Sequence, residues 1–255
     1  MKDQNIRVTS VSEIINRNPG SIKVFEKFKI DYCCNGKLNF EEACRRANVN
    51  QENIIEQLNQ GITDTQPVKI RVKDWPMELL ANYIIANHHM YVKKVTPEIS
   101  FLTKKVMAVH GALHPELVDI HTQFEILSAE LSQNMYKEEV ILFPAVAKLT
   151  KLNDHLPPCY REKIDEIGYS LIHPIEVMKA EHEYASQCLI KLRELCGNYT
   201  LPPKACSSYT LLYKRLQEFE EDLLTHIHLE NNILFPKIMA LEKEVMANSK
   251  LGKTG

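Results

Sequence analysis

The chain has little of what disulfide-stapled, β-rich or membrane-spanning proteins require. It holds 8 glycines in 255 residues, and aromatic side chains make up 7%, which is low for a sandwich or barrel. The seven cysteines are an odd number without regular spacing, and the chain starts without an apolar leader run. We therefore expect a reducing, cytoplasmic location. No apolar stretch approaches the ~18 to 20 residues of a membrane span.

The sequence also has no excess of charge of either sign. Its 31 basic and 33 acidic side chains nearly cancel, so we expect neither nucleic acid nor an acidic membrane as a partner. Leu, Glu, Lys and Ile are its commonest residues, 44% of the chain is hydrophobic, and its length suffices for a substantial core. These features predict an all-α fold.

The helical patterns divide the chain into a small domain and a larger one. Residues 1–60 contain four short patterns (11–16, 21–28, 39–47 and 50–58), with Ser21 as a candidate N-cap. Residues 61–73 resemble a linker, and Asp74 is a candidate cap for the next helix.

Four long helical patterns follow the linker, at 76–109, 115–149, 172–196 and 204–244. They predict an up-down four-helix bundle over 74–245, with 246–255 as a C-terminal tail. Pro97 predicts a bend in the first helix. Pro144 and Pro236 should each kink their helix or begin its termination.

A seven-residue string occurs twice in the bundle. Glu-x-x-Ile-Leu-Phe-Pro starts at Glu138 and again at Glu230, 92 positions later, and His89 and His182 precede the two copies in nearly the same register. The copies differ one helical turn before the glutamate, where the second has His226 and the first has Asn134. The chain therefore contains an internal duplication with one chemically important departure.

The duplicated residues predict a metal site inside the bundle. His226 and Glu230 are four residues apart and share one helix face. Buried carboxylates cost several kcal/mol each unless a cation compensates them. Imidazole and carboxylate suit iron or zinc, and facing helices of bundles hold carboxylate-bridged di-iron centres. The candidate ligands, with the two glutamates as bridges, are His89, Glu138, His182, His226 and Glu230.

The other histidines are weaker candidates. His88 adjoins His89, and the sequence leaves open which of the two faces inward, whereas His228 should project away from the His226 face. We expect the histidines near the first interhelical turn to be solvated, and these are His110, His114 and His121.

Cys33 and Cys34 are adjacent in a predicted turn that includes Asn35-Gly36. Adjacent cysteines form a disulfide only in a strained ring, so we expect no lasting bond between them. They would instead capture metal or nitric oxide, exchange mixed disulfides, or simply pack in the small domain. The remaining cysteines carry no paired signal, and these are Cys44, Cys159, Cys188, Cys196 and Cys206.

Four motifs in this order resemble one family. They are Asp-Tyr-Cys-Cys-Asn-Gly-Lys from Asp31, Lys-Glu-Glu-Val-Ile-Leu-Phe-Pro from Lys137, Val-Met-Lys-Ala-Glu-His-Glu from Val177, and His-Ile-His-Leu-Glu-Asn-Asn-Ile-Leu-Phe-Pro from His226. They resemble the iron-sulfur cluster repair proteins, the RIC (repair of iron centres) family of the ScdA or YtfE type. The resemblance implies a small Cys-Cys domain followed by a hemerythrin-like four-helix bundle with a non-haem di-iron centre.

The resemblance also implies a function. The protein would repair iron-sulfur clusters damaged by oxidative or nitrosative stress, with iron donation as its mechanism and damaged iron-sulfur proteins as acceptors. The alternatives are nitric oxide reduction or other redox chemistry at the iron, or binding and sensing of O2 or nitric oxide. The motifs suit both a catalytic and a non-catalytic protein, and the N-terminal module could pair two copies into a homodimer.

Asn134 departs from the family pattern, which has histidine at that position. A neutral amide is a poor iron ligand, so one iron would take water, or Tyr136 or His88 would substitute, or the site would hold one metal. A missing nitrogen ligand should weaken one iron and open a coordination position.

Overall fold

The protein is all-α, as its composition predicts. The computed structural model describes residues 6–60, 72–155 and 170–251, and within those ranges it contains helices and no strand. One isolated β-bridge joins Ser10 and Asn39. None of the helices in these ranges is both long and apolar enough to cross a membrane.

The chain divides into two compact units. One consists of Met77–His226 and Lys237–Gly255, and the other consists of Met1–Pro76 together with Ile227–Pro236, a short stretch of the last long helix. The predicted boundaries at 60, 73 and 245 stay a prediction. Most of the predicted linker lies outside the described residues, while α12 extends to Leu251.

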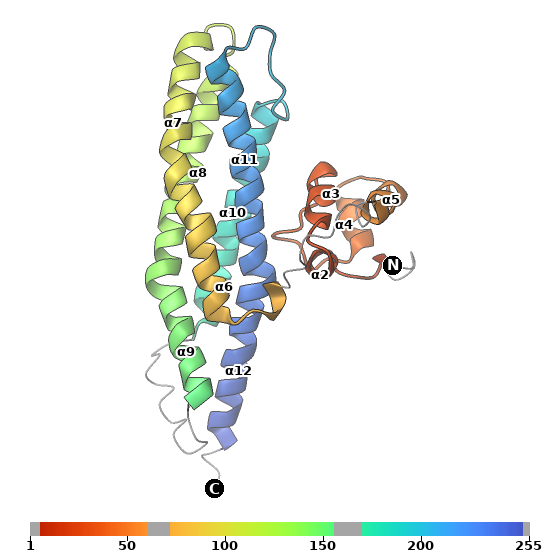
Figure 1. Ribbon diagram of the computed structural model, residues 1–255, viewed down its shortest axis with the longest axis vertical. Coiled ribbons are helices and arrows are strands. Elements are labelled where there is room, and N and C mark those ends of the chain that lie inside the picture. The colour runs from red at the N-terminus through yellow and green to blue at the C-terminus, as the bar shows by residue number, and fades with distance from the viewer. Residues whose placement is uncertain (1–5, 61–71, 156–169, 252–255) are drawn as a thin grey trace. The chain divides into compact units, whose positions relative to one another are not determined.

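Four long helical rods form the larger domain and lie side by side in Figure 1. The first rod contacts the second, and the second contacts the third. The start of the first rod contacts the end of the second, so these two run in opposite directions. In chain order the segments are α6 (Met77–Tyr83), η2 (Ile84–His89), α7 (Met90–His110), α8 (Glu116–Lys137), η3 (Glu138–Leu142), α9 (Phe143–His155), α10 (Ile172–Leu195), α11 (Ser207–Leu229), η5 (Glu230–Leu234) and α12 (Phe235–Leu251). The predicted four-helix bundle is confirmed.

Apolar residues at helical spacing build the bundle core. On α8 they recur every three or four positions, and each is almost completely buried: Leu117, Ile120, Phe124, Leu127 and Leu131. The ring of Phe124 packs edge-on against Phe219 of α11, with centroids 5.6 Å apart. Burying such a side chain is worth about 1.5–3 kcal/mol, so this stripe fixes which face of α8 points inward.

Three of the four rods contain a π-helical segment that the sequence periodicity did not predict. In each segment a backbone N–H bonds five residues back: Met90 to Ile85, Phe143 to Glu138, and Phe235 to Glu230. The two copies of the repeated string thus share the same irregularity. A proline follows the phenylalanine in both copies, and its missing N–H already interrupts the α-helical ladder there.

Of the two alternatives predicted for Pro144 and Pro236, a kink or the start of helix termination, the structure excludes termination. Both stand at the second position of a further α-helix, α9 and α12, which continue to His155 and Leu251. Proline is tolerated in a first helical turn because that N–H needs no intrahelical partner. The π segment before each proline provides such a start inside a continuous rod.

Short helices make up the N-terminal part of the other unit: α2 (Val11–Arg17), α3 (Ser21–Lys27), α4 (Phe40–Arg46) and α5 (Gln51–Gln60), followed by the short 3-10 turn η1 (Val72–Asp74). All four predicted helices are present. Ser10 and Asn39 cap α2 and α4 with their side-chain oxygens.

Two predicted caps were wrong. Ser21 is buried inside α3, whose N-cap is Gly20. Asp74 ends η1, while α6 begins only at Met77, so Asp74 lies too far from the helix to cap it.

Candidate metal centre

Four of the five predicted ligands converge inside the bundle. One donor atom from each of four residues lies within 4.8 Å of the other three, and all four side chains are buried: His89, Glu138, His226 and Glu230. Each of the first, second and fourth rods contributes to this group. His89 ends η2, while Glu138 begins η3 and Glu230 begins η5, so three of the four donors stand at the edges of the π segments.

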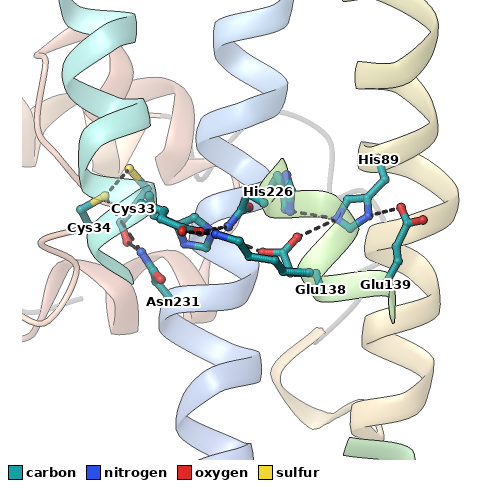
Figure 2. Close-up of polar contacts among 11 residues, drawn as sticks. Cys33, Cys34, His89, Glu138, Glu139, His226 and Asn231 are labelled. Carbon is teal, nitrogen blue, oxygen red and sulfur yellow. Dashed lines mark hydrogen bonds and ion pairs between the residues drawn. The ribbon is translucent and has the colours of Figure 1, made fainter. Parts of the chain in front are cut away.

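The carboxylate of Glu138 faces two histidines from two different rods. Its Oε2 atom lies 3.3 Å from Nε2 of His89, and its Oε1 atom lies 3.5 Å from Nε2 of His182 on α10. Figure 2 shows Glu138 and His89 pointing toward each other. Charge-assisted hydrogen bonds measure about 2.7–2.9 Å. Both of these N···O distances are longer, so the side chains converge on one point without forming short hydrogen bonds to each other. One oxygen for each histidine is the arrangement that a bridging carboxylate requires.

The surroundings of His226 and Glu138 hold these two side chains in the protonation states that bind metal. Burial lowers the pKa of His226 to about 3 against the opposing charge of Glu138, so the imidazole is neutral at pH 7. Burial alone would raise the pKa of Glu138, but the adjoining His182 and His89 outweigh it and hold that pKa well below its usual range. Neutral imidazole and ionised carboxylate are the states in which these groups coordinate cations.

The orientation of His89 depends on a residue that the sequence reasoning missed. Oε1 of Glu139 lies 2.8 Å from Nδ1 of His89 and also accepts a hydrogen bond from Lys93 at 2.6 Å. With the proton held on Nδ1 toward Glu139, the lone pair of Nε2 faces the cluster. The doubled glutamate in the first repeat was the available signal, since the second copy has Asn231 there.

Replacing Glu139 by Gln should weaken metal binding about 10-fold, because it removes the charge that makes the His89 imidazole more basic. The amide oxygen of Gln can still accept the Nδ1 hydrogen bond, so the fold should be unaffected. Competition against a chromophoric chelator measures the affinity. Glu183→Gln, an exposed carboxylate on α10, is the matched control, and equal affinities for the two variants would contradict the assignment.

Asn134 lies one turn before Glu138 and is 4% exposed, yet it is engaged elsewhere. Its Nδ2 donates to Oε2 of Glu181 at 3.0 Å, and Lys137 holds the other oxygen of Glu181. Tyr136 is 63% exposed and cannot substitute for the absent histidine. The donor set around His182 is therefore poorer than the one around His89 and His226.

Both His88 and His89 are buried, which resolves the question of which one faces inward. His88 stacks on the ring of His226, and its Nδ1 lies 3.0 Å from Oδ1 of Asp222. His88 is outside the group of four converging donors. His228 contacts Tyr32 and Asn232 instead of that group, as its helical position predicted.

The prediction that three further histidines are solvated holds only in part. His110, His114 and His121 are each partly buried. Their hydrogen-bond partners are Cys206, Glu116 and Thr103, respectively. These bonds stabilise the end of the bundle around the first interhelical turn and bring no further histidine to the metal candidates.

The two adjacent cysteines lie in a turn of the smaller unit, as predicted. Their sulfurs are 3.7 Å apart, so no disulfide joins them. Asn231 and Asn232, which belong to the same unit, donate side-chain hydrogen bonds to the carbonyl of Cys33 at 3.4 and 2.9 Å; Figure 2 shows Asn231 reaching it. Cys33 is buried and Cys34 is partly exposed, so one thiol of the pair is accessible. Cys159 lies outside the described residues.

Comparison with known proteins matches both parts of the chain. The family model described as the hemerythrin HHE cation binding domain matches residues 80–238, and the ScdA_N model, described as a domain of unknown function, matches residues 7–61. A probable iron-sulfur cluster repair protein of Haemophilus influenzae is 34% identical over 234 residues, which cover 90% of this chain and 96% of that protein. The chain belongs to the family of iron-sulfur cluster repair proteins.

A second relative supports this membership over a similar length. The iron-sulfur cluster repair protein YtfE of Yersinia pestis is 32% identical over 224 residues, which cover 87% of this chain and 92% of that protein. The hemerythrin match contains all five predicted metal ligands, and the ScdA_N match contains both adjacent cysteines. The family resemblance predicted from the motifs is confirmed.

Proposed function

We propose that this protein repairs iron-sulfur clusters damaged by oxidative or nitrosative stress, and that it does so by donating iron from a carboxylate-bridged di-iron centre. The ligands would be His89, Glu138, His182, His226 and Glu230. The observation that carries the proposal is the completely buried carboxylate of Glu138. One of its oxygens faces His89 and the other faces His182. A bound cation pair would compensate the charge buried there.

Donation requires that iron leave the site on demand. The position near His182 lacks a second nitrogen ligand, because residue 134 is an asparagine whose amide is bonded to Glu181. A site that is short of one ligand binds its metal more weakly. We therefore propose that the iron on the His182 side is the one transferred, while His89, His226 and Glu139 retain the other.

Cys33 and Cys34 would act at the acceptor. The partly exposed Cys34 thiol lies beside a buried Cys33, and thiolates exchange readily with the sulfur ligands of a damaged cluster. The acceptors would be iron-sulfur proteins that have lost iron. The names of the relatives support this substrate class.

Replacing both Cys33 and Cys34 by Ser should abolish repair while leaving the iron in the bundle. The reason is that these residues contribute nothing to the His/Glu cluster. Reactivation of a nitric oxide-damaged iron-sulfur enzyme, under anaerobic conditions and with iron-loaded protein, measures repair; metal analysis measures the bundle iron.

The control for this experiment is Cys206→Ser, another partly exposed cysteine that should retain full repair. Full repair by the double serine variant would contradict the role of the pair. Equal repair by metal-free wild-type protein would contradict iron donation itself.

A second candidate function is nitric oxide reduction at the iron, favoured by the same open position beside His182. That position would also admit O2 or nitric oxide as a ligand to be bound and sensed. Steady consumption of nitric oxide with an electron donor, faster than repair, would favour the reductase. Reversible binding without turnover would favour sensing.

A further inference from the structure

The turn that carries the two adjacent cysteines brings a third donor beside them. A carboxylate oxygen of Asp31 and the sulfurs of Cys33 and Cys34 all lie within 4.8 Å of one another. The sequence reasoning singled out the cysteines and overlooked the aspartate. All three donors come from four consecutive residues, so the arrangement is local to the turn.

The separation of the two sulfurs is too long for a disulfide and matches the spacing of two thiolates on one metal ion. The two Sγ atoms are 3.7 Å apart, whereas a disulfide bond measures about 2.05 Å. Two thiolates bound to one tetrahedral ion at about 2.3 Å lie about 3.8 Å from each other. The turn therefore already holds both sulfurs at the spacing of a chelate.

The carboxylate of Asp31 is held in place beside the sulfurs. Its Oδ1 lies 3.4 Å from Sγ of Cys33 and accepts the backbone N–H of Cys34 at 2.9 Å, while its Oδ2 accepts the side-chain amide of Asn35 at 2.6 Å. The backbone N–H of Asn35 also donates to Oδ1, at 3.4 Å. Each carboxylate oxygen has about two acceptor positions, and Oδ2 uses one of them for Asn35, so Oδ2 is the atom with a lone pair for a cation. Once both thiols ionise, three negative groups share this turn, and a cation would relieve their repulsion.

We propose that Asp31, Cys33 and Cys34 bind one divalent transition-metal ion of the thiolate-seeking class, Fe²⁺ or Zn²⁺. Two thiolates and a carboxylate occupy three positions of a tetrahedron and leave the fourth for water or an incoming sulfur ligand. Such a site holds its ion exchangeably. The proposal that this turn binds metal does not depend on the proposed function. One further step does rest on the proposed function: that iron occupies this site on its way to an acceptor.

Titration of the reduced, full-length protein with Co²⁺ under anaerobic conditions tests the site. Thiolate ligation gives Co²⁺ an intense near-ultraviolet charge-transfer band, and the His/Glu cluster contains no sulfur, so ions bound there contribute none of it. We expect the band to saturate at one ion per chain. The double variant Cys33→Ser with Cys34→Ser should abolish the band. Asp31→Asn should weaken the Co²⁺ affinity at least 10-fold, and Cys206→Ser should leave both the band and the affinity unchanged.

Competition then identifies the ion class, since Fe²⁺ or Zn²⁺ should each displace Co²⁺ and remove the band. A wild-type measurement avoids any dependence on variant folding: bound Zn²⁺ should slow alkylation of Cys33 and Cys34, read by peptide mass spectrometry, at least 10-fold. The absence of a thiolate band, its persistence in the double serine variant, or its indifference to Asp31→Asn would each overturn the site. Repair that proceeds normally without any band would overturn this site alone and leave the proposed function standing.

Discussion

Replacing Glu138 by Gln is expected to remove metal retention by the bundle almost completely. Glu138 is completely buried, and its two oxygens face His89 and His182 from opposite sides. An amide is neutral and its nitrogen cannot ligate, so the variant loses the bridge and half of the carboxylate charge in the cluster. Losing both functions costs more than the 10- to 100-fold typical of residues that only support a ligand.

Metal content and thermal stability together measure this effect. A ligand at about 100 times its dissociation constant stabilises the folded state by about 2.7 kcal/mol. For a domain of 150–250 residues this corresponds to a rise of roughly 5–11 °C in the melting temperature. We expect wild-type protein to show such a rise on metal loading, and Glu138→Gln to show none.

Glu130→Gln is the matched control for Glu138→Gln, since it makes the same change on an exposed side chain of the same helix, α8. It should retain both the metal and the thermal shift. If Glu138→Gln kept two ions per chain after dialysis, the bridging role would be wrong, whatever the effect of the variant on repair.

The burial of the two repeated glutamates could be predicted from the sequence, because a repeated string with apolar neighbours at helical spacing has only one inward face. Helical spacing also separated His228 from His226. Residues close in sequence therefore determine which helix face points inward. For such residues the geometry of a regular helix is sufficient to predict burial. This is the part of the site for which local rules hold.

The π segments could not be predicted in the same way. A single π turn is short compared with the window of about 11–18 residues over which helical periodicity is recognised, so the hydrophobic pattern does not reveal it. Its consequence is large at His88 and His89: a wider turn reduces the angle between consecutive side chains, and both histidines are buried. The expectation that only one of them faces inward assumed a regular α-helix.

Contacts between residues that are distant in sequence also could not be predicted. Glu139 orients His89 from 50 positions away, and Asp222 pairs with His88 from 134 positions away. Their exact pairing depends on how the rods are aligned, which is decided by the packing of the whole core. Asp31 was missed for a different reason: it is close to the cysteine pair, but only the bent backbone of the turn brings its carboxylate to the sulfurs.

Replacing Asn134 by His should strengthen binding of the second metal ion by about 10- to 100-fold. Asn134 is buried one turn before Glu138, at the position that His226 occupies relative to Glu230 in the other repeat. An imidazole there would add the nitrogen ligand that the first repeat lacks. Glu181 would lose its hydrogen bond from the amide of Asn134 but keep its ion pair with Lys137. The Glu181 side chain would therefore stay in place.

The rate at which a strong chelator removes each ion is the most direct measurement. Wild-type protein should release its two ions in a fast and a slow phase, and Asn134→His should slow only the fast one. Asn134→Ala separates the two roles of the residue, because it also breaks the bond to Glu181 without adding a ligand, and it should leave the fast phase fast. Under iron donation, the slower release in Asn134→His must also slow cluster repair by a similar factor. A variant that held its iron more tightly and still repaired at the wild-type rate would show that the transferred iron does not come from the His182 side.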